Sequence, residues 1–172
     1  RVLELTQWVH PGDVAVTLTP EGSVKYIYQV QGWWHIPWDA EAPDIGPLGI
    51  EVSYDKTSLA VNDMIEVTAT VTSNLDTNTG MVIVDLPIPP GFSLLSDKLQ
   101  PMVASGELAK IEATGVQLIL YVNDIPPGAT MSFVYDLVAL YPLEVSSGEA
   151  EVYQYYSPES RAQSEPVQIE VE

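Results

Sequence analysis

The side chains that could perform catalysis are abundant in this chain, but their spacing does not arrange them for it. With 24 Asp and Glu among 172 residues, two carboxylates will lie close together by chance, so no acid–base pair follows from the sequence. The two histidines, His10 and His35, have no second histidine at metal-ligand spacing. No serine lies in a Gly-x-Ser-x-Gly turn, and there is no cysteine to act as a nucleophile or thiolate ligand. We therefore expect no enzymatic activity, no metal site and no cofactor.

The charge of the chain limits its partners. Its 6 Lys and Arg stand against 24 Asp and Glu, a formal net charge of −18, and the cations are scattered singly. Because nucleic-acid binding needs clustered Lys and Arg, we expect no nucleic-acid partner. No stretch reaches the roughly 20 apolar residues of a membrane span, so membrane insertion is not expected either. Four acidic turns carry oxygens that Ca²⁺ could bind, but none forms an Asp-x-Asp-x-Asp-Gly loop: Asp55, Asp63, Asp76 and Asp124.

The elements that would position an interaction site are organised around residues 81–92. The first half, residues 81–86, is an apolar and β-branched run, which predicts a buried strand. Gly91 then permits a sharp turn, and Phe92 provides a large apolar anchor beyond it. Between the apolar run and Gly91, three prolines lack the N–H of a sheet ladder, so the strand must leave the sheet there: Pro87, Pro89 and Pro90. The segment predicts a core strand, a stiff exit and an anchored crossover.

The remainder of residues 48–172 predicts an all-β fold, a two-sheet antiparallel β-sandwich. Alternation within residues 64–71 puts every second side chain on one face: Ile65, Val67, Ala69 and Val71. Further strands are predicted at 48–54, 116–122, 130–140, 150–156 and 166–171. In the strand at 150–156, alternation places Tyr153 and Tyr155 on one face and Tyr156 on the other, and we interpret all three as packing residues.

One segment of the sandwich reads as a helix rather than a strand. Ser96 can cap a helix that runs through Leu99 and Met102 and stops at Gly106. Because Pro101 comes five residues after Ser96, it is too late for the first turn. We therefore expect a short crossover helix of one or two turns with a kink.

Residues 1–38 predict a different piece of structure, a small β meander of three short segments with too little sequence for a core of its own. A linker rich in Pro, Gly and acidic residues follows at 39–47. All four tryptophans lie in the meander: Trp8, Trp33, Trp34 and Trp38. Since the chain opens with Arg1, we expect a piece of a longer protein, in which these tryptophans make interdomain contacts. In the chain alone we expect them to pack on the sandwich or on a second copy, with a homodimer as our preference.

Several of these motifs, taken in order, resemble one protein family. The stretch Val84-Asp85-Leu86-Pro87-Ile88-Pro89-Pro90-Gly91-Phe92 resembles the hydrophobic-Asp-x-x-x-Pro-x-Gly-Phe signature of the alpha-2-macroglobulin receptor-binding domain. The short helix after it, the strand at 118–122 and Val152-Tyr153-Gln154-Tyr155-Tyr156 follow in the family's order, with Gln154 where Asp is usual. Gly12-Asp13-Val14 and Pro20-Glu21-Gly22-Ser23-Val24 resemble the strands leaving the family's split CUB domain. The resemblance covers residues 48–170 closely. It implies an incomplete CUB-like piece at 1–38 and a receptor-binding-like sandwich at 48–172. With no Asn-x-Ser/Thr site in the sequence, it also implies a prokaryotic member.

The resemblance implies a non-catalytic role. Family members are inhibitors that trap proteases after bait cleavage and tether them through a thioester, and a chain without cysteine holds no thioester motif. This chain would be a structural or interaction module of such an inhibitor, outside the cytoplasm. Its partners would be the missing CUB strands and thioester domain, and proteases only through the full-length protein. A stand-alone adhesion or surface-display sandwich is the alternative, since this fold class hosts many binding functions.

The resemblance also identifies two positions on the predicted helix. In members that bind the vertebrate endocytic receptor, two helix lysines four residues apart engage acidic pockets. Those positions correspond here to Ser96 and Gln100, and Lys98 lies between them on another side of the helix. Receptor binding of that kind is therefore predicted to be absent.

Overall fold

The computed structural model describes Thr17 and residues 46–172. The strands in this part are, in chain order, β1 (Leu48–Tyr54), β2 (Ser58–Leu59), β3 (Met64–Ser73), β4 (Val82–Pro87), β5 (Phe92–Leu95), β6 (Leu108–Ala113), β7 (Gln117–Val122), β8 (Thr130–Ala139), β9 (Leu143–Ser146), β10 (Glu151–Gln154), β11 (Ser157–Gln163) and β12 (Gln168–Val171). A 3-10 turn, η2 (Asp97–Leu99), and a short helix, α1 (Gln100–Ser105), connect β5 to β6.

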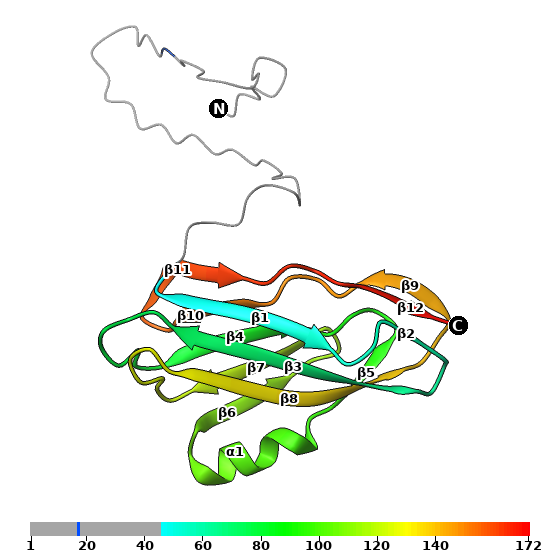
Figure 1. Ribbon diagram of the computed structural model, residues 1–172, viewed down its shortest axis with the longest axis horizontal. Coiled ribbons are helices and arrows are strands. Elements are labelled where there is room, and N and C mark those ends of the chain that lie inside the picture. The colour runs from blue at the N-terminus through cyan, green and yellow to red at the C-terminus, as the bar shows by residue number, and fades with distance from the viewer. Residues whose placement is uncertain (1–16, 18–45) are drawn as a thin grey trace, which may run out of the picture. The chain divides into compact units, whose positions relative to one another are not determined.

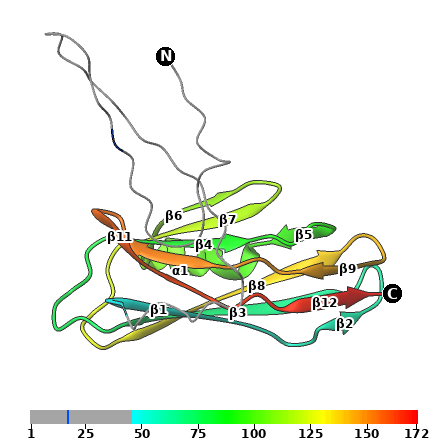
Figure 2. The ribbon, with the colours of Figure 1, turned by 90° about the horizontal axis from the view of Figure 1, so that it is seen from above.

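The strands form two large sheets and one small one. The first sheet has the order β1-β3-β8-β5, the second has the order β11-β10-β4-β7-β6, and the third has the order β2-β12-β9. Neighbouring strands are antiparallel in all of them except for the parallel pair β2 and β12. The first and second sheets lie over each other as two layers (Figures 1 and 2). The predicted all-β, two-sheet antiparallel sandwich is confirmed.

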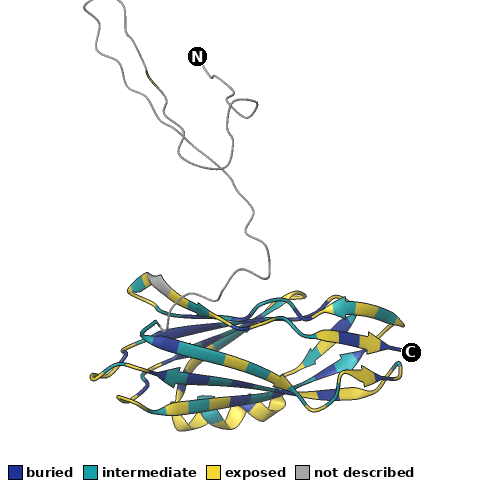
Figure 3. Ribbon diagram, turned by 45° about the horizontal axis from the view of Figure 1, so that its top comes forward, coloured by how far each residue is buried: buried dark blue, intermediate teal, exposed yellow. Residues whose placement is uncertain are grey.

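The core lies between the two layers, as the burial colours show (Figure 3). The four β3 residues predicted to share a face all have 0% of their surface exposed: Ile65, Val67, Ala69 and Val71. From the second sheet, Val82, Val84 and Leu86 of β4 face them and are equally buried. Burial of each Val, Leu or Ile side chain contributes roughly 1.5–3 kcal/mol, so these two central strands hold the layers together.

The proline-rich segment carries the chain from the second sheet to the first, as predicted. Pro87 is the last residue of β4, and Phe92, only 6% exposed, begins β5 in the first sheet. Gly91 turns the chain with φ of 85°, a left-handed conformation that residues with a Cβ rarely adopt. A Cβ at this position would also lie 2.3 Å from the Leu143 Cδ2 atom. Gly91 is therefore required both by its backbone angle and by its close packing.

The crossover helix is present, but its start differs from the prediction. Ser96 precedes η2 without making a side-chain capping hydrogen bond, and the α-helical turns begin at Gln100. Pro101 therefore lies in the first turn of α1, where its missing N–H costs nothing, rather than too late for it. The 3-10 turn takes up the residues that we had assigned to the first helical turn. Gly106 ends the helix in the left-handed conformation, as predicted.

The aromatic strand at 150–156 is shorter than predicted. Because the chain turns back from β10 into β11 after Gln154, alternation does not continue to the last two tyrosines. Tyr155 and Tyr156 are 50% and 81% exposed, so their interpretation as packing residues is wrong. Gln154, which replaces the family's usual Asp, donates its side-chain N–H to the Thr79 carbonyl at 2.7 Å. Five strands were not predicted: β2, β5, β6, β9 and β11. Apolar and polar residues alternate in β6 and β9, but only over four or five residues.

Two predictions lie wholly or largely outside the residues that the structure describes. These are the meander at 1–38 with its four tryptophans, and the linker at 39–47, of which the last two residues are described. Among the described residues, no helix is long and apolar enough to cross a membrane.

Candidate interaction surface

The structure brings Ser96 and Gln100 onto the same short helical connection between β5 and β6. Ser96 is half-buried at the start of η2, where its carbonyl accepts the Leu99 N–H at 3.0 Å. Gln100 is exposed at the first residue of α1. Neither side chain carries a charge.

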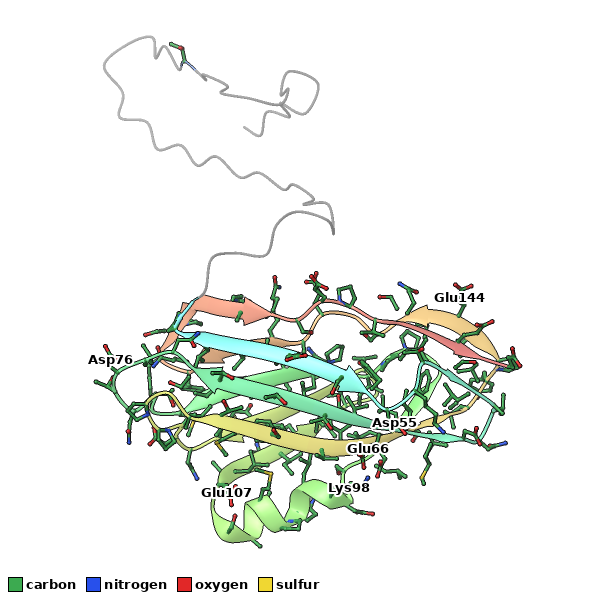
Figure 4. The ribbon with its side chains drawn as sticks, viewed as in Figure 1. Asp55, Glu66, Asp76, Lys98, Glu107 and Glu144 are labelled. Carbon is green, nitrogen blue, oxygen red and sulfur yellow. The ribbon has the colours of Figure 1, made fainter. Side chains whose placement is uncertain are left out.

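Lys98, which lies between them, is held by the first sheet. Its Nζ atom is 2.6 Å from Glu66 Oε2 on β3 and 2.7 Å from Asp136 Oδ1 on β8. Glu66 and Asp136 are direct cross-strand partners, so Lys98 lies between two like charges that would otherwise repel each other. Figure 4 shows Lys98 beside Glu66 at the edge of the helix. The hydrogen bonds to Asp136 and then to Glu66 raise the pKa of the Lys98 ammonium.

The apolar side chains of the helical connection between β5 and β6 pack against the core of the sandwich. Leu99 is fully buried in the core, and Met102 and Val103 pack against it from α1. At the C-terminal end, the Gly106 N–H donates to the Val103 carbonyl at 3.2 Å, and the Asn123 side chain donates to the Gly106 carbonyl at 2.7 Å. Apolar burial, an ion-pair triad and a capped end thus hold this connection rigidly.

The acidic turns that could have bound Ca²⁺ mostly stabilise their own loops. Asp55 Oδ1 accepts the Glu66 N–H at 2.8 Å, which closes the turn after β1. Asp124 accepts hydrogen bonds from the Asn78 side chain at 2.6 Å and from the Gly80 N–H at 3.0 Å. Across the described residues, no group of three or more His, Cys, Asp or Glu could hold a metal ion. The sequence did not reveal that these carboxylates accept hydrogen bonds within their own turns, because a carboxylate in that role has the same sequence pattern as one that binds a cation.

The outer surface of the second sheet carries a row of side chains that the sequence did not reveal. The cross-strand register places Tyr121, Ile83 and Tyr153 side by side on β7, β4 and β10, with Lys110 and Arg161 at the two ends. Lys110 Nζ lies 5.7 Å from the centre of the Tyr121 ring, and the Arg161 guanidinium lies 5.3 Å from that of Tyr153. Ile83 is only 4% exposed although it points away from the core. The row therefore forms a small outer cluster with a cation over each tyrosine.

Carboxylates next to this row neutralise its cations. Arg161 pairs with Glu151 at 2.9 Å, and Lys110 pairs with Glu112. Asp85, which follows Ile83 on the same face, accepts a hydrogen bond from the Gln117 side chain at 2.9 Å. Burial first, and the charge of Glu151 second, raise the pKa of the Asp85 carboxyl. Charged and aromatic groups on this face are thus satisfied by their own neighbours.

These features define a class of domain: an antiparallel β-sandwich whose open edge is covered by a short crossover helix. The chain belongs to the A-macroglobulin receptor binding domain family, which matches residues 77–166. The match spans the proline-rich crossover, the helix and the strands from β4 to β11, and it confirms the family to which the sequence motifs pointed. No curated protein sequence matches the chain.

Solved structures of bacterial alpha-2-macroglobulins have the same fold. The native Escherichia coli protein, solved from domain MG7 to the C-terminus, is 17% identical with a TM-score of 0.67, over 78% of this chain and 25% of that one. The cryo-EM reconstruction of the E. coli protein in its native conformation is 17% identical with a TM-score of 0.66, over 80% of this chain and 10% of that one. The Salmonella protein reacted with methylamine is 19% identical with a TM-score of 0.64, over 77% and 10%. This chain therefore spans a small part of the structures it resembles.

Proposed function

We propose that this chain is a non-catalytic structural and interaction module at the C-terminal end of an alpha-2-macroglobulin-like protease inhibitor. The observation that carries the proposal is the family match over residues 77–166, which includes the crossover and the helix. Trapping of proteases would belong to the full-length protein, and this module would act as a scaffold or report its conformational change. The sequence motifs for a split CUB domain support the same placement within a longer inhibitor. Family membership favours this role over a stand-alone adhesion domain.

An inhibitor of this kind meets its target proteases outside the cytoplasm, so we place the protein in an extracytoplasmic compartment. Fractionation of cells that express the full-length gene tests this: the protein should be found in the periplasm, at the cell surface or in the medium. Recovery with the cytoplasmic fraction would contradict the location without affecting the family assignment.

The chain alone is expected to inhibit no protease. Incubated in excess with trypsin or elastase, it should leave the cleavage of casein and of a small chromogenic peptide unchanged. The full-length protein should slow casein cleavage but spare the peptide, because a trapped protease keeps its active site but excludes large substrates. Protection of casein by the isolated chain would overturn the assignment of a non-inhibitory module.

Binding to a vertebrate-type receptor is expected to be absent, because the two helix positions are Ser96 and Gln100 and the nearby Lys98 is engaged by two carboxylates. The chain should show no salt-sensitive binding to the acidic ligand-binding modules of such a receptor, whereas a Ser96→Lys/Gln100→Lys variant should gain it. Binding by the unmodified chain that Lys98→Ala abolishes would show that Lys98 is available after all.

A further inference from the structure

We propose that one end of the outer face of the first sheet binds a partner protein whose contact surface has apolar side chains surrounded by Lys and Arg. The docking surface is an apolar patch on β3, β5 and β8, and the structure assigns it to neither the core nor the helix. The patch consists of Met64, Leu95, Val138 and Leu140. This inference goes beyond the proposed inhibitor role and does not depend on it.

The strand register gathers these four side chains. Met64 is the direct partner of Val138, and Leu95 is the direct partner of Asp136, two residues before Val138 on the same face of β8. Leu140 follows Val138 by two residues, so alternation brings it to that face as well. Met64, Leu140 and Leu95 are 56%, 41% and 40% exposed, and Val138 is partly exposed. Three of the seven large apolar side chains that are exposed among the described residues thus lie together.

The opposite end of the same face shows what an unoccupied solvent surface looks like in this domain. There the outward positions of β3 and β8 hold hydroxyl groups, with Thr72 3.2 Å from Thr130 and Thr70 3.4 Å from Ser132. An antiparallel sheet with one solvated face normally keeps this polar character along its whole length. A change from Thr and Ser to Met, Val and Leu within the same two strands marks the apolar end as a contact surface.

Charge decides the kind of partner. Glu66 and Asp136 lie directly beside the patch in the sheet register, and Asp55 is bonded to the Glu66 backbone. The nearby cation, Lys98, is shared between Glu66 and Asp136, which leaves this rim net negative. A second copy would bring two chains of net charge −18 together, which long-range repulsion opposes. A partner with a basic rim around apolar anchors satisfies both features of the surface.

The test uses a defined probe, a twelve-residue helical peptide with leucines on one face flanked by lysines, and a matched peptide with glutamates for the lysines. Titrated into the isotope-labelled full chain, the basic peptide should shift the amide NMR signals of the patch residues, saturably and less at high salt. The acidic peptide should not. In Met64→Lys/Leu140→Lys the affinity for the basic peptide should fall at least about tenfold, because apolar anchors are lost.

Thr70→Lys/Thr130→Lys is the matched control, since it adds the same charge with the same diagonal spacing at the hydroxyl end of the face. This control should retain most of the affinity. Equal losses in both variants, or shifts spread over the whole acidic surface, would mean non-specific attraction and would overturn the proposal. Sedimentation of the chain alone can also contradict the proposal. If the chain forms a dimer and Met64→Lys/Leu140→Lys is a monomer, the patch binds a second copy of the chain.

Discussion

The outer faces of the two large sheets treat their apolar side chains in opposite ways. On the second sheet, Ile83 points outward but is only 4% exposed, because its cross-strand neighbours Tyr121 and Tyr153 flank it and cations lie over their rings. On the first sheet, Met64 and Leu140 point outward and stay 56% and 41% exposed. The outer face of the second sheet covers its apolar side chain with its own neighbours, whereas the outer face of the first sheet leaves apolar side chains exposed at one end.

The two faces differ in the exposure of their apolar side chains rather than in the types of residue that they carry. Both faces carry acidic residues and large apolar groups, and both have a cation held by carboxylates. On the second sheet, Lys110 and Arg161 lie over the rings of Tyr121 and Tyr153. On the first sheet Lys98 instead pairs with Glu66 and Asp136 on the two central strands, and Met64 stays 56% exposed.

The largest effect should come from breaking the complete face. Ile83→Ala should lower the free energy of unfolding by about 2–4 kcal/mol, since truncating this buried side chain leaves a cavity between the two tyrosines. Met64→Ala should change it by less than about 0.5 kcal/mol, because Met64 is already 56% exposed. Urea unfolding of both variants measures the difference. Equal costs would mean that the two faces are not different in kind.

A smaller effect is expected at the ion-pair triad of the first sheet. Lys98→Gln leaves Glu66 and Asp136 opposite each other without a cation, so the variant should melt at a lower temperature than the unmodified chain. The loss should shrink in 1 M salt, which screens exposed charges. Because pairing raises the pKa of Lys98, the stabilisation is present at neutral pH and is lost as the pH rises through that raised value.

Lys56→Gln is the control for this variant, since it removes one positive charge and, within residues 46–172, no ion pair involves Lys56. It should leave the melting temperature nearly unchanged. If both lysine variants lose the same stability, the effect is one of net charge and the triad has no specific role.

The smallest effect should appear at Asp85 on the second-sheet face, as a pH dependence. Its pKa is raised in the folded chain, so between the unfolded value of 3.8 and the folded one the folded state binds more protons. Stability contributed at this site therefore falls as the pH rises through that window. Asp85→Asn removes the ionisation, so the variant should gain stability relative to the unmodified chain from acid to neutral pH. A difference that is constant with pH, or that slopes the other way, would contradict the raised pKa.

The fold could be predicted where a single residue type forces the backbone. Pro87 lacks the N–H of a sheet ladder, and Gly91 allows a left-handed turn that other residues rarely adopt, so the end of β4 and the crossover followed from the sequence. The alternation of β3 gave its buried face for the same reason, because only one register buries Ile65 and Val67.

Prediction failed where contacts between residues far apart in the sequence determine the backbone conformation or the partner of a side chain. Nothing in the sequence fixes the turn after Gln154. There the Tyr155 N–H donates to the Met81 carbonyl and the Gln154 side chain donates to the Thr79 carbonyl, both far away in the chain. The partners of Lys98 lie on β3 and β8, 32 and 38 residues away, so its spacing on the helix gave no sign of them. The apolar patch could have been noticed, since Met64 and Val138 occupy positions on β3 and β8 that alternation turns outward, and Leu140 follows Val138 by two residues.

The contrast between the two faces is tested most directly by hydroxyl-radical footprinting of the chain, read out by mass spectrometry over a concentration series. Met64, Leu95 and Leu140 should be labelled rapidly at every concentration, and Ile83 should be labelled slowly, as their exposures require. Rapid labelling of Ile83 would show that the second-sheet cluster is not closed. Protection of Met64 and Leu140 at all concentrations would show that the chain already covers its own patch, and the account of an open face would be wrong.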